Sequence, residues 1–559
     1  MKNLSGSLST PQSQKMFWAI AGVIILAGIF FRFWNLGSDE LTFDEGIYAF
    51  RSIGYLDYME NPAQVTPIQV FTDRVAPAWL SLSFHDAPPL FFIIGHIFFS
   101  IFGESVLAAR LPSALAGLGI VVLMFFVTRL LFEKFEDEKL REWKEWAGML
   151  AAGVTAVSFA SVAISRLDQL EAVLFFLVLL NLYIFLRLID DTRWWWVFGL
   201  TFGLAMLVKY TCVFLIPVYF IYLAITRSPL LKNWKCYAGW GIAGLLFLPV
   251  IIYNIKLYGL WKHFDLQFAY LFGQATPEWQ GVGGKNQEPF GNILTNVRIV
   301  YSIPFLILTF VGIWISVAKK SLGKIRWLPV LLFAFILALL IAVGSAIRFI
   351  SFLIIPAVFF ITIAFFVFSK KFRSPSSVIV IVIVICFILS ESYFTSTMVF
   401  ANRADYGIVK LDSYFNAAFG EARPVGLLGH PNPNLNEIIK EYAENRPATL
   451  PRVGIVYDDR ISTPARLWLF SRRQYYHGIP VMPMSAFLET IKTSGGQALK
   501  GFEIYFVKAE SGTTISEIKN PEYMKSLNEF FAKLPAQSKF TIKNSLGIPT
   551  FEVSKFSLD

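Results

Sequence analysis

Two adjacent acidic residues, Asp44 and Glu45, stand shortly after the first long apolar run of the chain, residues 17–36. Carboxylates are costly near hydrocarbon, so charges at the mouth of a membrane helix tend to mark a function or a water-filled cavity. A carboxylate in such a place could act as a general base that deprotonates a hydroxyl or an amine. The alternative is structural, because Asp44 could cap the N–H groups of a helix through Tyr48. The two interpretations stay open at this point.

Further charged residues lie at the ends of later apolar runs and could share the same site. Asp168 could serve as a second acid or base. Arg and Lys are the usual partners of phosphate, so the basic residues are candidate anion ligands. These basic candidates are Arg166, Lys209, Lys285 and Arg348. The alternatives are a local ion pair between Arg166 and Asp168, and a Lys209 side chain that only reaches the membrane interface.

The pair His85 and Asp86 precedes a short apolar run, residues 88–102. An imidazole and a carboxylate could bind phosphate, transfer a proton or ligate a divalent metal, although two ligands in sequence do not make a ligand set. His96, on an apolar face of the run, is interpreted as a histidine satisfied in the core or at an interface. A divalent metal at His85 and Asp86 is therefore the one cofactor hypothesis.

The elements that carry these residues are expected to be membrane helices. The 559-residue chain is 55% hydrophobic and 16% aromatic, and apolar runs of about 20 residues are long enough to cross a bilayer. Eleven spans are predicted, at residues 17–36, 106–132, 147–164, 170–189, 194–208, 213–225, 237–255, 297–317, 327–343, 349–368 and 378–396. The three cysteines show neither metal spacing nor a disulfide framework.

The basic residues predict how these spans are oriented. They gather in the N-terminal tail and in joints near residues 129–144, 187–193, 227–235, 319–326 and 370–373. Short loops rich in Lys and Arg stay cytoplasmic, and all of these joints share one side only if residues 88–102 form an interfacial or half-inserted helix. The net charge of +10 therefore indicates a membrane orientation, and nucleic acid is excluded as a partner.

This topology places the candidate residues together on the outer side of the membrane. The segments predicted to face outward include Asp44, Asp168, Lys209, Arg348 and the loop that contains Lys285. A one-sided group of charges at helix ends is typical of an active site at the external interface.

The last part of the chain is polar and of mixed charge. It contains strand-like runs at residues 452–457 and 502–507, helix-like runs at 464–473 and 522–534, and a final strand-like pair. The sequence therefore predicts two domains, a transmembrane domain over residues 1–400 and an extracytoplasmic α/β domain over residues 401–559.

Taken together, these motifs resemble the GT-C class of membrane glycosyltransferases, in the branch of the protein O-mannosyltransferases and lipid A aminoarabinose transferases. The match covers about residues 17–368. It rests on five segments that follow one another in the expected order, namely residues 43–48, 85–117, 165–187, 203–209 and 348–356.

The resemblance implies transfer of a sugar from a polyprenyl-phosphate donor to a protein, glycolipid or cell-envelope acceptor on the outer face of the membrane. It implies that Asp44 is the general base, with Asp168 in the same cavity. Arg348 and Lys209 would bind the lipid phosphate. The further candidate substrate-binding residues are Glu45, Tyr48, His85, Arg166 and Lys285.

Two other functions are alternatives to this one. A transporter or flippase of lipid-linked sugars usually shows repeated halves, broken helices or charges near mid-membrane. The chain has no evident repeat, and its charges gather at one face. A membrane scaffold without enzymatic activity leaves Asp44, Asp168 and Arg348 without a role.

Overall fold

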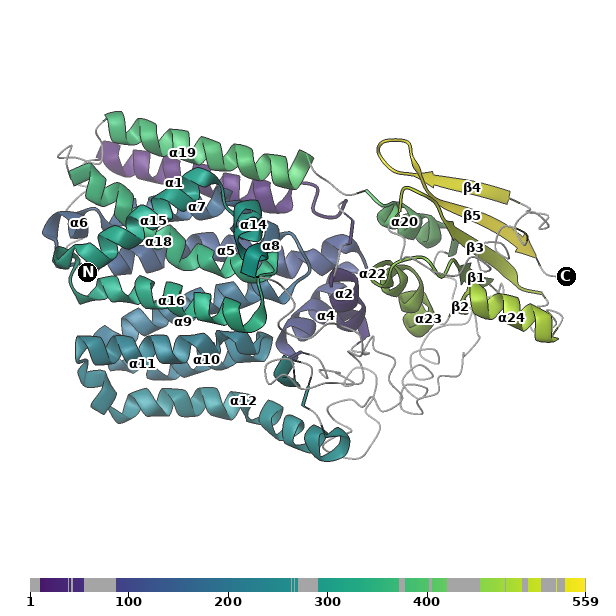
Figure 1. The fold of residues 1–559 in the computed structure, drawn as a ribbon, viewed down its shortest axis with the longest axis horizontal. Helices are drawn as coiled ribbons and strands as arrows, with labels where there is room; N and C mark the ends of the chain where they lie inside the picture. The colour runs from purple at the N-terminus through teal and green to yellow at the C-terminus, as the bar shows by residue number, and fades with distance from the viewer. Residues whose placement is uncertain are drawn as a thin grey trace. The chain divides into compact units, whose positions relative to one another are not determined.

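The structure is a computed structural model. It describes residues 11–38, 40–41, 44–54, 87–262, 264–265, 267–269, 290–370, 378–401, 405–419, 453–477, 479–494, 501–513, 529 and 538–557. The chain divides into two compact units. The first comprises Met1–Leu36, Asp86–Phe91 and Arg110–Asn402, and the second comprises Gly37–His85, Phe92–Ala109 and Arg403–Asp559. Each unit is described by itself (Figure 1).

The first unit consists of helices. The longer ones are α1 (Pro11–Phe33), α5 (Val106–Glu133), α7 (Lys144–Val157), α8 (Phe159–Ser165), α9 (Leu170–Asp190), α10 (Trp195–Val208), α11 (Leu215–Thr226), α12 (Trp234–Trp261), α14 (Phe290–Val300), α15 (Ile303–Ala318), α16 (Trp327–Val343), α18 (Ile354–Ser369) and α19 (Val378–Ser396). Shorter helical pieces are α6 (Glu138–Glu142), η2 (Thr192–Trp194), η3 (Tyr210–Phe214), η4 (Pro229–Lys232), η6 (Lys320–Leu322), η7 (Lys324–Arg326), α17 (Ile347–Ile350), η8 (Ser351–Leu353) and η10 (Thr397–Ala401).

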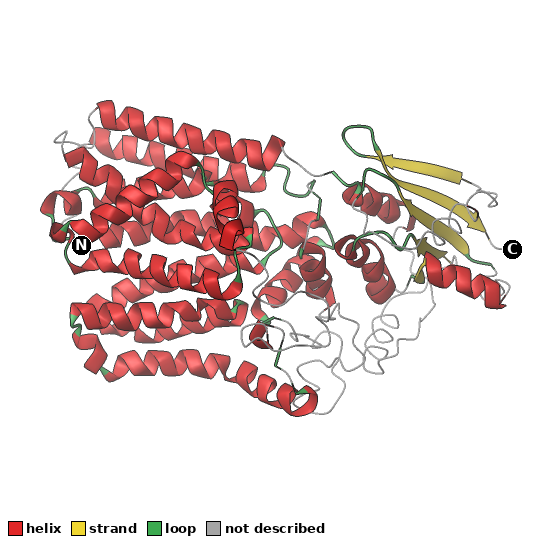
Figure 2. Ribbon diagram, in the orientation of Figure 1, coloured by secondary structure: helices red, strands yellow, loops and turns green. Residues whose placement is uncertain are grey.

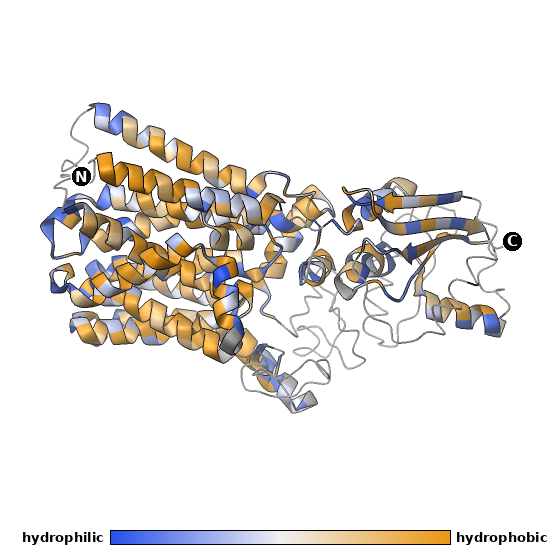
Figure 3. Cartoon of the chain, turned by 45° about the horizontal axis from the view of Figure 1, so that its top comes forward, coloured by the Kyte–Doolittle hydropathy of each residue, from blue (hydrophilic) through white to orange (hydrophobic). Residues whose placement is uncertain are grey.

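These helices are those of a multi-pass membrane protein. Within the described residues, seven are long and apolar enough to cross a bilayer, and up to nine spans result if each of two bent pairs counts as one. Figure 3 shows that the helices are hydrophobic along most of their length. α10 has 14 residues and α11 has 12, so both are short for a bilayer about 30 Å thick. The predicted count of eleven spans therefore stays a prediction.

At one bent pair, side chains bind the backbone carbonyls that the helix break leaves without partners. α7 and α8 meet at Ser158 with a bend of 58°, and a break leaves carbonyl groups without their helical partners. The guanidinium of Arg32 donates to the carbonyls of Ala156 at 3.0 Å and Thr155 at 3.2 Å, and Thr395 Oγ1 donates to the carbonyl of Val157 at 2.6 Å. Buried side-chain donors thus replace the missing backbone donors.

The second bent pair is built around a serine cap. α14 and α15 meet at a bend of 105°. Ser302 precedes α15, and its Oγ accepts a hydrogen bond from the N–H of Phe305 at 3.2 Å, which is the geometry of a helix N-cap. The same hydroxyl donates to the carboxylate of Glu391 on α19. A buried acidic side chain of one span is thereby tied to the break in another.

The second unit contains a five-stranded sheet, visible as the yellow arrows in Figure 2. Its strands are β1 (Val453–Tyr457), β2 (Val481–Pro483), β3 (Glu503–Ala509), β4 (Ser538–Lys543) and β5 (Pro549–Ser557), in the order β2-β1-β3-β5-β4. β1 pairs in parallel with β2 and β3, whereas β5 pairs antiparallel with β3 and β4. The helices of this part are α20 (Ile408–Phe419), α22 (Thr463–Arg466), η11 (Leu467–Ser471), α23 (Arg472–His477) and α24 (Met484–Ser494).

Segments from early in the chain complete the core of this unit. α2 (Glu45–Gly54) and most of α4 (Leu90–Phe102) belong to it. Phe50 of α2 packs in one hydrophobic cluster with Phe415 of α20, Trp468 of η11 and Phe551 of β5. The hydroxyl of Tyr476 on α23 also donates to the carbonyl of Phe50 at 2.8 Å. The helix that follows Asp44 is therefore held by the C-terminal part of the chain.

The predicted α/β character of the C-terminal part is confirmed. The strand-like runs at 452–457 and 502–507 correspond to β1 and β3, and the final pair corresponds to β4 and β5. The helix-like run at 464–473 lies within the consecutive helices α22, η11 and α23. Most of the run at 522–534 lies outside the described residues. The domain boundary between residues 400 and 401 stays a prediction.

Candidate functional site

The site residues of the second unit lie at the start of α2. Asp44 occupies the N-cap position, because its carbonyl accepts hydrogen bonds from the N–H groups of Ile47 at 3.1 Å and Tyr48 at 3.0 Å. Its side chain is half-buried, and Glu45 in the first turn is fully buried. A position at a helix start suits a cap, but it also holds a carboxylate at a fixed place in the chain. The geometry is compatible with both roles that the sequence left open.

Two polar residues of α2, Tyr48 and Arg51, pack against an aromatic ring of α4. The ring of Tyr48 lies 6.0 Å from the ring of Phe92 on α4, and the guanidinium of Arg51 lies 5.0 Å above the same ring. Ala49 and Phe50 face the core. α2 is thus anchored on one side by apolar burial, while Asp44 and Tyr48 remain at its partly exposed side.

His96 forms hydrogen bonds at the C-terminal end of α2. Its Nδ1 lies 3.0 Å from the carbonyl of Ser52 and 2.9 Å from that of Ile53, in the last turn of the helix. Carbonyl groups only accept, so Nδ1 must carry the proton. His96 is part-buried and bound to these carbonyls, which agrees with its interpretation as a histidine satisfied in the core or at an interface.

In the first unit, Lys209 and Arg348 come together around one aromatic ring. The ammonium of Lys209 lies 4.9 Å from the centre of the Phe349 ring, and the guanidinium of Arg348 lies 5.1 Å from it. Lys209 follows α10 directly, and Arg348 belongs to the short helix α17 before α18. Lysine and arginine side chains are the usual ligands of phosphate, so two such cations near one ring are chemically able to bind an anion.

A buried carboxylate, Glu171, completes this cluster. Its Oε1 accepts from Lys209 Nζ at 2.6 Å, and the charge of Arg348 also acts on it. Glu171 is fully buried in the first turn of α9. Glu171 is not among the site residues predicted from the sequence. The signal that could have found it is a carboxylate inside an apolar span, which is costly unless it has a partner.

A second buried carboxylate, Asp265, fixes the residue next to Lys209. Its Oδ2 accepts from the hydroxyl of Tyr210 at 2.8 Å and from Asn254 Nδ2 at 2.6 Å. Its Oδ1 accepts from the N–H groups of Gln267 and Phe268, both at 3.0 Å. Asp265 is not among the predicted site residues either, because nothing in its local sequence links it to Tyr210. The network fixes the side chain of Tyr210, the residue that follows Lys209 in the chain.

Arg166 and Asp168 lie in the joint between α8 and α9, and both are buried. The Nη1 of Arg166 donates to the carbonyls of Trp34 at 2.9 Å and Phe31 at 3.1 Å, at the C-terminal end of α1. Its guanidinium also lies 5.4 Å from the ring of Phe400. These contacts give Arg166 a structural role at that helix end, while its contact with phosphate stays a prediction.

The remaining predicted site residues, His85, Asp86 and Lys285, lie outside the described residues. Among the residues that the structure describes, no three His, Cys, Asp or Glu side chains form a group that could hold a metal ion. The metal hypothesis at His85 and Asp86 therefore stays a prediction.

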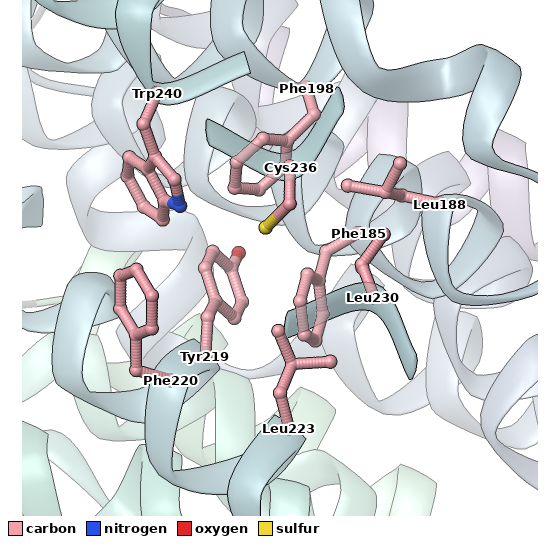
Figure 4. Close-up of a pocket in the computed structure, with 9 residues that line it drawn as sticks. All are labelled: Phe185, Leu188, Phe198, Tyr219, Phe220, Leu223, Leu230, Cys236 and Trp240. Atoms are coloured by element: carbon pink, nitrogen blue, oxygen red, sulfur yellow. The ribbon is translucent and has the colours of Figure 1, made fainter. Parts of the chain in front are cut away.

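A separate pocket of the first unit is apolar. Figure 4 shows its lining, which comes from α9, α10, α11, η4 and α12. The lining residues are Phe185, Leu188, Phe198, Tyr219, Phe220, Leu223, Leu230, Cys236 and Trp240. None of these nine carries a charge, and the hydroxyl of Tyr219 is bound to Asn181 Oδ1 at 2.9 Å. This pocket therefore offers no charged group to a phosphate.

Comparison with known proteins links the sequence to mannosyltransferases. Residues 86–253 match the family model described as dolichyl-phosphate-mannose-protein mannosyltransferase. The putative mannosyltransferase YkcB of Bacillus subtilis (strain 168) is 28% identical over 154 residues, which are 26% of this chain and 20% of that protein. YycA of the same organism, also a putative mannosyltransferase, is 29% identical over 177 residues, or 31% and 23%. The alignments thus span about a fifth of the length of these curated relatives.

Solved structures match over a much larger part of the chain. ArnT from Cupriavidus metallidurans, solved with undecaprenyl phosphate, aligns with a TM-score of 0.52 over 98% of both chains at 14% identity. The Archaeoglobus fulgidus oligosaccharyltransferase in its apo form aligns with a TM-score of 0.50 over 88% of this chain and 69% of its own, at 15% identity. The predicted fold class is confirmed: the chain has the fold of the GT-C membrane glycosyltransferases, with a C-terminal α/β part.

Proposed function

We propose that the protein transfers a sugar from a polyprenyl-phosphate donor to a protein, glycolipid or cell-envelope acceptor. The observation that carries the proposal is the pair of cations, Lys209 and Arg348, gathered around Phe349 at helix ends of this fold. The likeness to ArnT, which was solved with undecaprenyl phosphate, supports a lipid phosphate as the anion that they bind. A polyprenyl chain stays in the bilayer, since each exposed CH₂ costs about 0.8 kcal/mol.

The proposed reaction needs a base and a stabilised leaving group. Asp44 takes the proton of the acceptor hydroxyl or amine, and the acceptor atom forms a bond to the anomeric carbon of the sugar. The bond between that carbon and the phosphate oxygen breaks, and polyprenyl phosphate leaves. Lys209 and Arg348 stabilise the negative charge on the leaving phosphate, and Asp168 is the second proposed catalytic residue. Attack on the opposite face of the ring inverts the anomeric centre.

The placement of charges supports an outer location for this chemistry. Lys-rich and Arg-rich joints are expected on the cytoplasmic side, whereas Asp44, Asp168, Lys209 and Arg348 lie at the other ends of the predicted spans. In this proposal the active site and the C-terminal unit face away from the cytoplasm. The comparisons give no support to the alternative of a transporter or flippase of lipid-linked sugars.

The test is a transfer assay with purified protein, a panel of labelled polyprenyl-phosphate sugars and mass detection of the modified acceptor. Asp44→Asn removes the base and keeps the size of the side chain. We expect its turnover to fall by about 10²-fold or more. The control is Asp191→Asn, which changes a carboxylate paired with Arg193 at the surface. Wild-type turnover by a correctly folded Asp44→Asn protein would exclude Asp44 as the base.

A further inference from the structure

The cluster around Phe349 contains a charge that no step of the proposed reaction uses. Glu171 touches Lys209 directly, with 2.6 Å between Nζ and Oε1, and both side chains are buried. Its other oxygen, Oε2, has no hydrogen-bond partner among the described residues. Burying a carboxylate carries a large desolvation penalty. A purely structural ion pair with Lys209 does not explain why the protein tolerates this penalty. Its position beside the two candidate phosphate ligands suggests an electrostatic role.

The charges of the cluster can be summed directly. Lys209 and Arg348 each contribute one positive charge, and Glu171, which feels both of them, contributes one negative charge. The net charge of these three side chains is therefore +1. Without Glu171, the same two cations would carry +2.

The two lipid phosphates of the proposed reaction differ in charge by nearly one unit. The donor is a phosphodiester and carries a single negative charge. The product, polyprenyl phosphate, is a monoester and carries about −1.5 to −2 at pH 7, because its second pKa is about 6. A site with a net charge of +1 is matched to the donor. A site with a net charge of +2 favours the product that must leave.

We propose that Glu171 sets the donor specificity of the site, by lowering the charge of the Lys209–Arg348 pair so that the phosphodiester binds and the phosphomonoester product is released. This inference rests on the proposed function, since it takes the ligand to be a polyprenyl phosphate. Glu171 acts through Lys209 and is therefore a positioning and charge-setting residue. It does not touch the reacting atoms.

The experiment compares the affinities of two probes for purified full-length protein in detergent. Undecaprenyl phosphate is the monoester, and undecaprenyl methyl phosphate is a diester with the same lipid. Glu171→Gln keeps a hydrogen-bond acceptor for Lys209 and removes the charge. We expect it to shift the ratio of monoester to diester affinity toward the monoester by on the order of tenfold at pH 7.5. The shift should shrink near pH 5, where the monoester also carries a single charge.

Two further variants keep the test informative if Glu171→Gln folds poorly. Glu171→Gln combined with Lys209→Gln replaces the ion pair by a neutral pair and leaves the net charge at +1, so its affinity ratio should stay close to that of wild type. Lys209→Gln alone lowers the net charge to zero and should weaken the monoester more than the diester. Glu391→Gln changes a different buried carboxylate, bound to Ser302, and should leave the ratio unchanged.

The outcomes separate this inference from the proposed function. If wild type binds both probes but all Glu171 and Lys209 variants keep its affinity ratio, the inference is wrong while the transferase proposal stands. If wild type binds neither probe, both are wrong. A tenfold shift in Glu171→Gln that is absent from the double variant would support the inference, and slower turnover with stronger inhibition by undecaprenyl phosphate should accompany it.

Discussion

Glu40, four residues before Asp44, is a buried carboxyl group that ties the first loop to the C-terminal part of the chain. Its Oε2 accepts hydrogen bonds from the N–H groups of Ile408 at 3.0 Å and Val409 at 3.2 Å, at the start of α20. Burial raises the pKa of Glu40 to about 7, and the nearby charge of Asp405 acts in the same direction, while the N–H donors oppose both. The group therefore titrates near neutral pH.

This pKa predicts how stability depends on pH. The folded pKa of Glu40 lies above its ordinary value of 4.5, so the folded protein keeps a proton that the unfolded chain releases. The resulting stabilisation is fully present below about pH 4.5 and is lost as the pH rises through about 7, with a total of up to about 3 kcal/mol. Glu40→Gln keeps the acceptor oxygen and removes the titration.

The measurement is the melting temperature of wild type and Glu40→Gln between about pH 5 and pH 8. We expect the wild-type melting temperature to fall more steeply across this range than that of the variant. Equal slopes for the two proteins would mean that Glu40 does not titrate there. Glu40→Ala, which loses both hydrogen bonds to α20, should be less stable at every pH.

At the level of elements, close helix packing in the first unit depends on small residues. α10 and α12 lie against each other, and a Cβ atom at Gly239 would stand 2.7 Å from the carbonyl oxygen of Trp195. A Cβ at Gly241, two residues further along α12, would meet nothing within 4 Å. The two glycines therefore offer a matched pair of substitutions on one helix.

We expect Gly239→Val to destabilise the protein by about 1–3 kcal/mol, because the two helices must move apart. Gly241→Val should leave stability close to that of wild type. Thermal unfolding in detergent measures both. If the two variants melt at the same temperature, the close approach of α10 and α12 does not limit stability.

The sequence predicted the elements better than the contacts between them. Apolar runs indicate spans because hydropathy depends on local composition. The runs that predicted β1, β3 and the final hairpin are likewise a property of consecutive residues. The breaks at Ser158 and Ser302 were not predicted, since they depend on Arg32, Thr395 and Glu391, which are far away in sequence. Lys209 and Arg348 were selected from their positions at helix ends. Glu171 could have been selected as a carboxylate inside an apolar span, but its pairing with Lys209 follows only from the packing of α9.

At the level of each whole unit, buried charges hold the C-terminal part together. Asp412 on α20 accepts from Arg472 at 2.5 Å and from Arg473 at 2.7 Å, and both arginines are buried. The guanidinium of Arg472 lies 4.0 Å from the centre of the Trp468 ring. Glu104, just after α4, adds a contact with His477 at 2.7 Å. This cluster joins three segments of the second unit.

We expect Asp412→Asn to destabilise the second unit by about 3–5 kcal/mol, because it leaves two buried cations without their shared carboxylate. The unfolding of this unit can be followed by the loss of hydrogen-exchange protection of the backbone amides around Trp468, which is fully buried. The control is Glu552→Gln, which breaks a pair with the exposed Lys539 and should cost at most about 1 kcal/mol. A similar loss in both variants would argue against a special role for the cluster.

The proposed orientation of the whole molecule can be tested by cysteine labelling in intact cells. With the native cysteines replaced, a single cysteine at position 139 is expected to react only after permeabilisation, because its joint is rich in Lys and Arg. A cysteine at position 285 should react with an impermeant reagent from outside. Labelling of both positions from the same side would contradict the predicted topology.

The second unit combines segments that lie far apart in the chain, and this limits when it can assemble during translation. Glu40 and its partner Ile408 are separated by 368 residues, and Phe50 and Tyr476 by 426. At about 5–20 residues per second, a ribosome needs roughly 20–70 s to add the residues between Glu40 and α20. During that time the segment with Asp44 is already synthesised, but the residues that cover Phe50 are not. Insertion of the spans before α20 therefore precedes assembly of this unit, and Asp44 acquires its final surroundings only after α20 and the strands that follow it have been synthesised.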